Sequence, residues 1–116
     1  MKTTYTAVFF ETREERSPVE DFLANLDPRI EAKATSLIKI LEEKGPDLHR
    51  PYADVVRGKI RELRIRTLGV QVRILFAFAG KEIVLLHGIK KKEPAIPPRE
   101  IDTADARLLD WLHREK

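Results

Sequence analysis

The sequence predicts an α+β fold in which a small antiparallel sheet is packed by an N-terminal helical hairpin and a C-terminal helix. Three observations predict it. Two helical patterns follow a first strand, three strand-like segments joined by short turns occupy residues 59–89, and a last helical pattern follows them. A chain of 116 residues with 42% hydrophobic residues can bury one core, so we expect a single domain over residues 1–116.

The N-terminal part is expected to form one strand and two helices. Residues 4–10 alternate and are rich in β-branched and aromatic residues, which predicts a strand. Residues 17–20 (Ser-Pro-Val-Glu) form a capping-box pattern that starts a short helix ending near Leu26. The Asp-Pro pair at 27–28 starts a second helix, and the Gly-Pro pair at 45–46 ends it. Its apolar positions recur at helical spacing at Ile30, Ala34, Leu37, Ile38 and Leu41.

The C-terminal part is expected to form an antiparallel meander and a helix. Residues 46–57 show no clear period and are expected to be a loop. Residues 59–67 and 70–79 alternate, and residues 83–89 are nearly all apolar, which suits a central strand covered on both faces. Residues 90–98 are expected to be an exposed loop, and the helices to pack on one side of the sheet. The last helix has an apolar stripe at Ile101, Ala104, Leu108, Trp111 and Leu112.

Positive charge is concentrated in the middle of the chain. Residues 57–99 hold eleven Lys and Arg and three acids, a charge of +8, whereas residues 1–56 carry −3 and residues 100–116 carry −2. The formal net charge of +3 therefore hides a basic centre between acidic flanks. Because this centre is predicted to be a sheet, its charges gather on one face and form a surface suited to a polyanion.

The composition argues against several classes of protein. No apolar run approaches the roughly 20 residues of a membrane span, and the N-terminus does not resemble a signal peptide, so we expect a cytoplasmic protein with no membrane partner. The lack of cysteine excludes disulfides, a thiolate nucleophile and Cys-ligated zinc. The three histidines lie far apart in the sequence, so we expect neither a metal site nor a cofactor.

The polar face of the meander is expected to bring cations from three strands together. Arg64 and Arg66 leave one strand on the same side, about 7 Å apart. Arg73 lies on the next strand, and three lysines at 90–92 follow the third. A solvated basic face is the alternative interpretation, and it is the better one for a single arginine. For the whole set we favour a phosphate site, because adjacent like charges destabilise a protein unless an anion offsets them.

Such a face has the groups needed to cleave RNA without a metal. RNA carries its own nucleophile, the 2′-hydroxyl, which must be aligned and deprotonated while the leaving oxygen is protonated. Arginine matches phosphate oxygens with its planar fork, and a lysine crowded by cations can serve as acid or base. For Glu62, beside Arg64, we favour holding an arginine in position over acting as a base. His87 is expected to be a buried, hydrogen-bonded core residue, with a catalytic role as the less favoured alternative, and Trp111 is expected to be a packing residue and not a base-stacking platform.

Four segments carry a resemblance to a known family. They are Glu-Leu-Arg at 62–64, Val-Arg-Ile-Leu-Phe at 72–76, Leu-His-Gly-Ile-Lys-Lys-Lys at 86–92 and Pro-Pro-Arg-Glu-Ile at 97–101. In order and spacing the chain resembles the phage-derived, HigB-like branch of the RelE/ParE toxin superfamily. The resemblance implies a RelE-like fold and the toxin of a type II toxin–antitoxin system that cleaves mRNA on the ribosome. It also implies a partner, a cognate antitoxin with a helix-turn-helix domain.

The resemblance also implies roles for individual residues. By position, Arg64 corresponds to a cation on the first meander strand, Arg73 to the arginine that stabilises the scissile phosphate, and Lys91 to a strand-end general acid. The residues expected to be catalytic are Arg64, Arg73, Lys91 and Lys92. Those expected to bind RNA are Arg61, Glu62, Arg66 and Lys90.

The sequence departs from the family pattern at three places. Ile89 stands where the family usually has Phe, residues 95–96 are Ala-Ile where it has Lys-Thr, and no tyrosine follows the lysines to stack on a base. Tyr52 is far away in the sequence. Two other functions stay open: a ParE-like inhibitor of DNA gyrase, which shares the fold, and an RNA-binding module that does not cleave.

Overall fold

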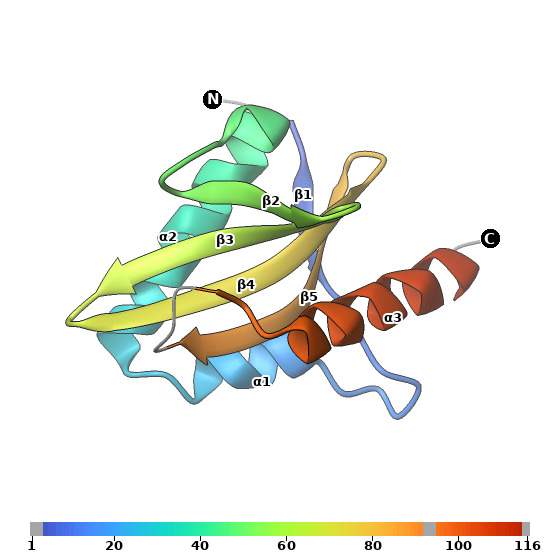
Figure 1. The fold of residues 1–116 in the computed structure, drawn as a ribbon, viewed down its shortest axis with the longest axis horizontal. Helices are drawn as coiled ribbons and strands as arrows, with labels where there is room; N and C mark the ends of the chain where they lie inside the picture. Colours follow the sequence, from blue (N-terminus) through green and yellow to red (C-terminus); the bar gives the residue numbers. More distant parts are fainter. Residues whose placement is uncertain (1–3, 92–94, 115–116) are drawn as a thin grey trace.

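In the computed structural model, which describes residues 4–91 and 95–114, a five-stranded sheet lies between two layers of helices (Figure 1). The strand order across the sheet is β1-β5-β4-β3-β2. The elements in chain order are β1 (Thr6–Phe9), α1 (Pro18–Ala24), α2 (Pro28–Lys44), the 3-10 turn η1 (Gly45–Asp47), β2 (Ala53–Arg57), β3 (Ile60–Thr67), β4 (Val70–Ala79), β5 (Glu82–Lys91) and α3 (Pro98–Arg114).

The sheet confirms the α+β fold and the meander but differs from the expected sheet in two ways. Strands β2 to β5 are antiparallel neighbours, whereas β1 runs parallel to β5, so the sheet is mixed. Residues 53–57 form the edge strand β2 where a loop was expected. Because one side of an edge strand faces solvent and Val55 is 54% exposed, these residues show no alternating apolar pattern.

The proline pairs start the N-terminal helices as expected, but their caps differ. The side chain of Asp27 accepts a hydrogen bond from the backbone N–H of Arg29 at 2.8 Å, which satisfies a donor at the start of α2. Ser17 occupies the N-cap of α1 without a side-chain capping bond, so the expected capping box is not formed there. Gly45 ends α2 with a positive φ of 55°, a conformation that glycine adopts without steric cost.

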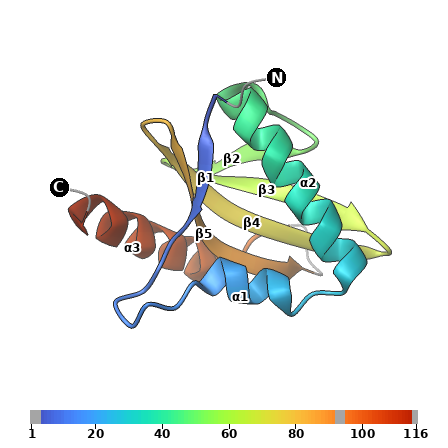
Figure 2. The same ribbon diagram turned by 180° about the vertical axis from the view of Figure 1, so that it is seen from behind.

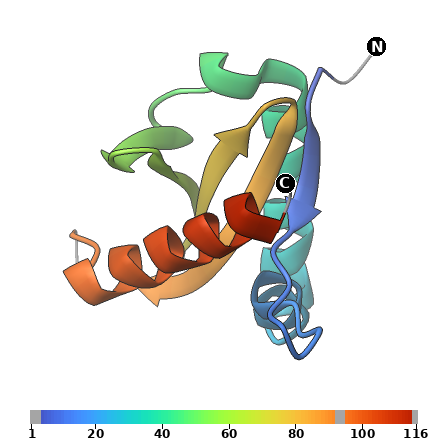
Figure 3. The same ribbon diagram turned by 90° about the vertical axis from the view of Figure 1, so that its right-hand side faces the viewer.

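Helices cover both faces of the sheet, which corrects the expectation that all would lie on one side. Helices α1 and α2 pack on one face against residues such as Leu63, Ile74 and Leu85. Helix α3 packs on the other face, against residues such as Leu75 and Leu86. Figures 2 and 3 show the two layers from behind and from the side. Apolar residues of β5 serve both cores, which explains its nearly continuous apolar run.

Strand β5 is longer than the sequence indicated. It begins at Glu82 and ends at Lys91, so Lys90 and Lys91 belong to the sheet and not to the expected exposed loop. The register between β4 and β5 shifts between Leu75 and Phe76, where β5 carries one extra residue. Within the described residues, no helix has the length and apolar character that crossing a bilayer requires.

Candidate functional site

A cluster of charged side chains lies where β3 ends and β4 begins. Ile60 and Leu75 pack against α3, and alternation along β3 and β4 puts Arg64 and Arg73 on that same face of the sheet. In Figure 1 helix α3 crosses the near face beside β5, and no helix of the described residues lies in front of the end of β3. The cluster therefore forms at the end of this face that the helical layer leaves uncovered.

Glu62 is at the centre of the cluster, where it binds two arginines at once. Arg73 donates from Nη1 to Oε1 of Glu62 at 2.8 Å. Arg64 donates to the other carboxylate oxygen from Nε at 3.1 Å and from Nη2 at 2.9 Å. The carboxylate thus accepts three charge-assisted bonds and fixes both guanidinium groups. This is the positioning role favoured for Glu62 from the sequence.

The two arginines differ in their access to solvent. The side chain of Arg73 is 5% exposed and that of Arg64 is 21% exposed, while Arg66 at the next outward position is exposed. Burial lowers the pKa of the Arg73 guanidinium from its ordinary value, Glu62 opposes that effect, and Arg64 and Arg66 add to it. Arginine stays protonated at neutral pH in any case. An incoming anion therefore meets Arg64 and Arg66 first, with Arg73 beneath them.

The register places the backbone of Lys91 in line with the cluster. Arg66 pairs with Gln71, and Gln71 pairs with Lys91, so these three residues form one row across β3, β4 and β5. With adjacent strands about 4.8 Å apart, the Cα atoms of Arg66 and Lys91 are roughly 10 Å apart. Backbone positions on three strands thus lie in one row, whereas the sequence-based prediction concerns their side chains. The side chain of Lys91 and the whole of Lys92 lie outside the described residues.

Two of the cations expected to bind RNA lie on the other face of the sheet. The guanidinium of Arg61 stacks over the ring of Phe78 at 5.2 Å, and Phe78 packs against the core under α1 and α2. Lys90 pairs in register with Val72, which belongs to that same core. Because paired residues share a face, Lys90 extends away from Arg73. The structure therefore brings Glu62, Arg64, Arg66 and Arg73 together but not Arg61 or Lys90.

Two residues beside the cluster were not expected from the sequence. Asp54 of β2 lies 3.5 Å from Nη2 of Arg64 and accepts a bond from Nε of Arg50 at 2.7 Å, so the ion network extends to the sheet edge. The hydrogen bond from Arg50 lowers the pKa of the Asp54 carboxyl from its ordinary value. Tyr52 accepts a backbone bond from the N–H of Arg64 at 2.8 Å, although it is twelve positions away in the sequence.

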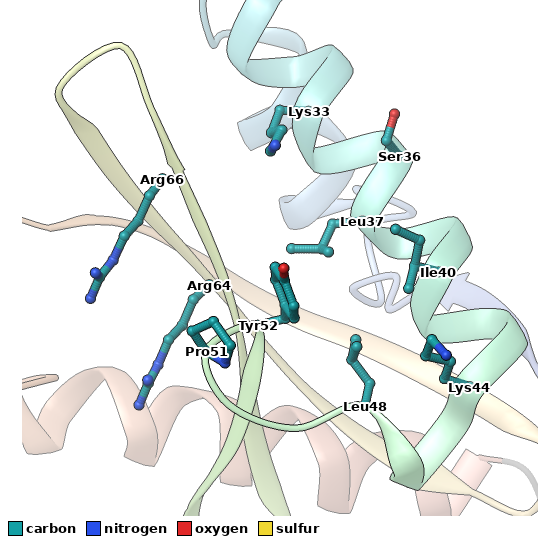
Figure 4. A pocket seen from close by; sticks show the side chains of 10 residues that line it. All are labelled: Lys33, Ser36, Leu37, Ile40, Lys44, Leu48, Pro51, Tyr52, Arg64 and Arg66. Atoms are coloured by element: carbon teal, nitrogen blue, oxygen red, sulfur yellow. The ribbon is translucent and has the colours of Figure 1, made fainter.

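A cleft of about 450 Å³ opens beside Arg64 and Arg66, between β3 and α2 (Figure 4). Figure 4 shows the two arginines pointing to the same side, away from α2, with Tyr52 between them and the helix. The sequence gives only a weak indication that Tyr52 lies beside Arg64, because Tyr52 is a single aromatic residue in a segment that is expected to be a loop.

His87 belongs to a second polar group, between β5 and α3. Its Nδ1 accepts from Nη1 of Arg107 at 3.1 Å, and its Nε2 pairs with Glu100. Arg107 also donates to the carbonyl of Leu86 at 2.8 Å, and burial lowers the pKa of this guanidinium. His87 is therefore hydrogen-bonded as expected, although its side chain is 19% exposed and so half-buried. Trp111 packs against the core under α3, as expected.

The cluster is suited to binding anions. Within residues 4–91 and 95–114, no three His, Asp or Glu side chains are close enough to hold a metal ion. Glu62 neutralises one of the charges of Arg64, Arg66 and Arg73, so the set keeps an excess of positive charge. Oriented guanidinium groups of this kind bind phosphate oxygens and stabilise negative charge that develops on them.

Two comparisons with known proteins found similarities, and the family match covers the part of the chain that holds the cluster. Residues 21–109 match the family described as "Phage derived protein Gp49-like (DUF891)". The chain is also similar to a protein of Mycobacterium tuberculosis (strain ATCC 25618 / H37Rv) named "Putative toxin HigB2", with 39% identity over 79 residues. That match covers 62% of this chain and 39% of the relative, so the chain matches about two-fifths of the relative's length.

Proposed function

The chain belongs to the Gp49-like family of phage-derived proteins, and from this premise we propose that it is the toxin of a type II toxin–antitoxin system and cleaves mRNA. Membership of the family confirms the resemblance to the phage-derived, HigB-like branch. The observation that supports the proposal is the arginine cluster. Glu62 orients the guanidinium groups of Arg64 and Arg73, and the exposed Arg66 lies beside them.

The proposed reaction uses the RNA itself as nucleophile. Arg64 and Arg66 bind the non-bridging oxygens of the scissile phosphate and hold the 2′-hydroxyl in line with phosphorus. As the 2′-oxygen attacks, negative charge grows on the phosphate, and the charge of buried Arg73 stabilises it from below. Glu62 keeps both Arg64 and Arg73 in place. Removal of the 2′-hydroxyl proton and protonation of the 5′-oxygen are assigned to Lys91 and Lys92, on the strength of the family resemblance alone.

The proposal includes partners and a place of action. The substrate is mRNA on the ribosome, so the protein would act in the cytoplasm. A cognate antitoxin with a helix-turn-helix domain would neutralise it, and acidic groups on that antitoxin would complement the exposed cations.

The burial of Arg73 favours one second candidate, an RNA-binding module that does not cleave. A side chain that is 5% exposed and already bound to Glu62 reaches a phosphate only after Glu62 or the backbone shifts. In that case the protein would bind RNA with a steep dependence on salt and leave it intact.

Growth and the integrity of mRNA after brief induction in bacterial cells test the proposal. We expect the wild-type chain to stop growth and to produce new 5′ ends within coding regions, and Arg64→Ala and Arg73→Ala to restore growth while remaining folded. Lys59→Ala is the matched control, because it removes one exposed cation just before β3 that takes no part in the ion pairs of the cluster. Intact mRNA with induced DNA damage would instead indicate a gyrase inhibitor, and equal toxicity of Arg64→Ala and wild type would refute the site.

A further inference from the structure

The cleft between α2 and β3 adjoins the arginine cluster. Arg64 belongs to both, since its guanidinium binds Glu62 while the residue also lines the cleft. The opposite wall comes from residues of α2 that recur at helical spacing and so share one side of the helix. These residues are Lys33, Ser36, Leu37, Ile40 and Lys44. Arg64 therefore lies between the cluster, which is on the α3 face of the sheet, and the cleft, which opens toward α2.

Three of the four cations that line the cleft have no ion-pair partner among the described residues. Its lining includes the cations Lys33, Lys44, Arg64 and Arg66, and none of the described residues that line it is acidic. Among the described residues, no carboxylate lies within ion-pair distance of Lys33, Lys44 or Arg66. Exposed like charges around one hollow raise the local concentration of an anionic ligand and favour its binding.

Tyr52 provides an aromatic surface between the two arginines and α2. The residue is 51% exposed, although its main chain is fixed at two points. Its N–H donates to the carbonyl of His49 at 3.0 Å, and its carbonyl accepts from the N–H of Arg64 at 2.8 Å. The buried residues Leu37 and Leu48 line the cleft beside it. An exposed ring on a fixed backbone can stack on a flat ligand with little loss of conformational entropy.

We propose that this cleft binds a nucleotide of single-stranded RNA next to the cleaved bond, with its base stacked on Tyr52 and its phosphates bound by Arg66 and Lys33. The inference rests on the proposed function, because it makes the cleft an extension of the same substrate site. A single strand is required, since only an unpaired, unstacked base presents its face to an aromatic side chain.

Binding of a labelled, unstructured RNA of about ten nucleotides, followed by fluorescence anisotropy over a series of salt concentrations, tests the cleft. We expect Tyr52→Leu to weaken binding roughly tenfold without changing the salt dependence, because stacking releases no counterions. Tyr52→Phe keeps the ring and should bind like wild type. Lys33→Gln should reduce the slope of log K against log salt by about 0.7. Val55→Ala, an exposed apolar truncation on β2 outside the cleft lining, is the matched control.

The outcomes separate this inference from the proposed function. Wild-type protein that binds RNA through Tyr52 but leaves mRNA intact would refute the nuclease and support the cleft. Cleavage by wild type, together with unchanged RNA binding by Tyr52→Leu and Lys33→Gln, would overturn the cleft and leave the nuclease standing. If those two variants instead escaped neutralisation by the antitoxin while binding RNA normally, the cleft would be a protein-docking surface and the inference would be wrong. Thermal melts confirm that each variant is folded.

Discussion

Replacing Glu62 with glutamine removes the charge that holds the cluster together while keeping the shape of the side chain. The carboxylate is 8% exposed and accepts one bond from Arg73 and two from Arg64. The glutamine amide can accept from only one of the arginines and turns an NH₂ group toward the other. Arg73, with 5% of its side chain exposed, then remains as a buried cation without a counter-ion.

Loss of one partner from a buried ion pair costs about 3 kcal/mol of unfolding free energy. A domain of this size has an unfolding entropy of about 0.24 kcal/mol/K at its midpoint, so Tm should fall by roughly 12 °C. Thermal unfolding followed by circular dichroism measures this shift. The double variant Glu62→Leu with Arg73→Met should regain most of it, because an apolar pair can replace a buried ion pair.

Arg57→Gln is the matched control for burial. Arg57 makes two ion pairs to α3 at 2.6 Å, shorter than the Arg73–Glu62 contact, but its side chain is 45% exposed. The hydrogen bond to Asp105, and after it the hydrogen bond to Asp102, raises the pKa of the Arg57 guanidinium. Because solvent screens them, we expect Tm of Arg57→Gln to stay close to wild type. A Tm for Glu62→Gln within about 2 °C of wild type would refute the view that Glu62 holds a buried cluster together.

Three further predictions address the fold, its pH dependence and the placement of cations. Gly88→Ala should lower the unfolding free energy by about 1–3 kcal/mol, because the new Cβ would lie 2.3 Å from Cδ2 of Phe22. Urea titrations measure this change, and a variant as stable as wild type would disprove the close packing of α1 on β5. The hydrogen bond from Arg29 lowers the pKa of the Asp27 carboxyl below its ordinary value of 3.8. The ionised carboxylate therefore stabilises the fold above that pH, and this stabilisation is lost as the pH falls through the folded-state pKa. The unfolding free energy of Asp27→Asn should therefore depend less on pH than that of wild type between about pH 5 and pH 2. Arg61→Gln should weaken RNA binding less than Arg66→Gln in the anisotropy assay, and an equal loss would contradict a site confined to the face of Arg64.

Local patterns in the sequence predicted most elements, because local physics determines them. Proline at the first helical position and an aspartate cap located α2, and period-two alternation located β3 and β4. Strand β2 was missed because Val55 and Val56 are consecutive and face different environments at a sheet edge. The parallel pairing of β1 with β5 was missed because it depends on the helical connection and not on any local pattern in β1.

The candidate site was predictable in outline but not in depth. Alternation correctly put Glu62, Arg64 and Arg66 on one face, and the short turn brought Arg73 opposite Arg64. Alternation alone does not reveal that Arg73 is buried or that Lys90 extends from the other face, since both depend on the packing of whole elements and on the register of β5. The closeness of Tyr52 to Arg64 arises from the path of the loop before β2, which no local pattern encodes.

The chemistry of cleavage is the most direct test of the account, because it depends on attack by the RNA's own 2′-hydroxyl at the arginine cluster. Purified protein is incubated with translating ribosomes carrying either an all-ribose mRNA or one with a single 2′-deoxynucleotide on the 5′ side of the cleaved bond. We predict fragments ending in a 2′,3′-cyclic phosphate from the first mRNA and no cleavage at the modified position in the second. Equal cleavage of both mRNAs, or fragments ending in a 3′-hydroxyl, would contradict the mechanism.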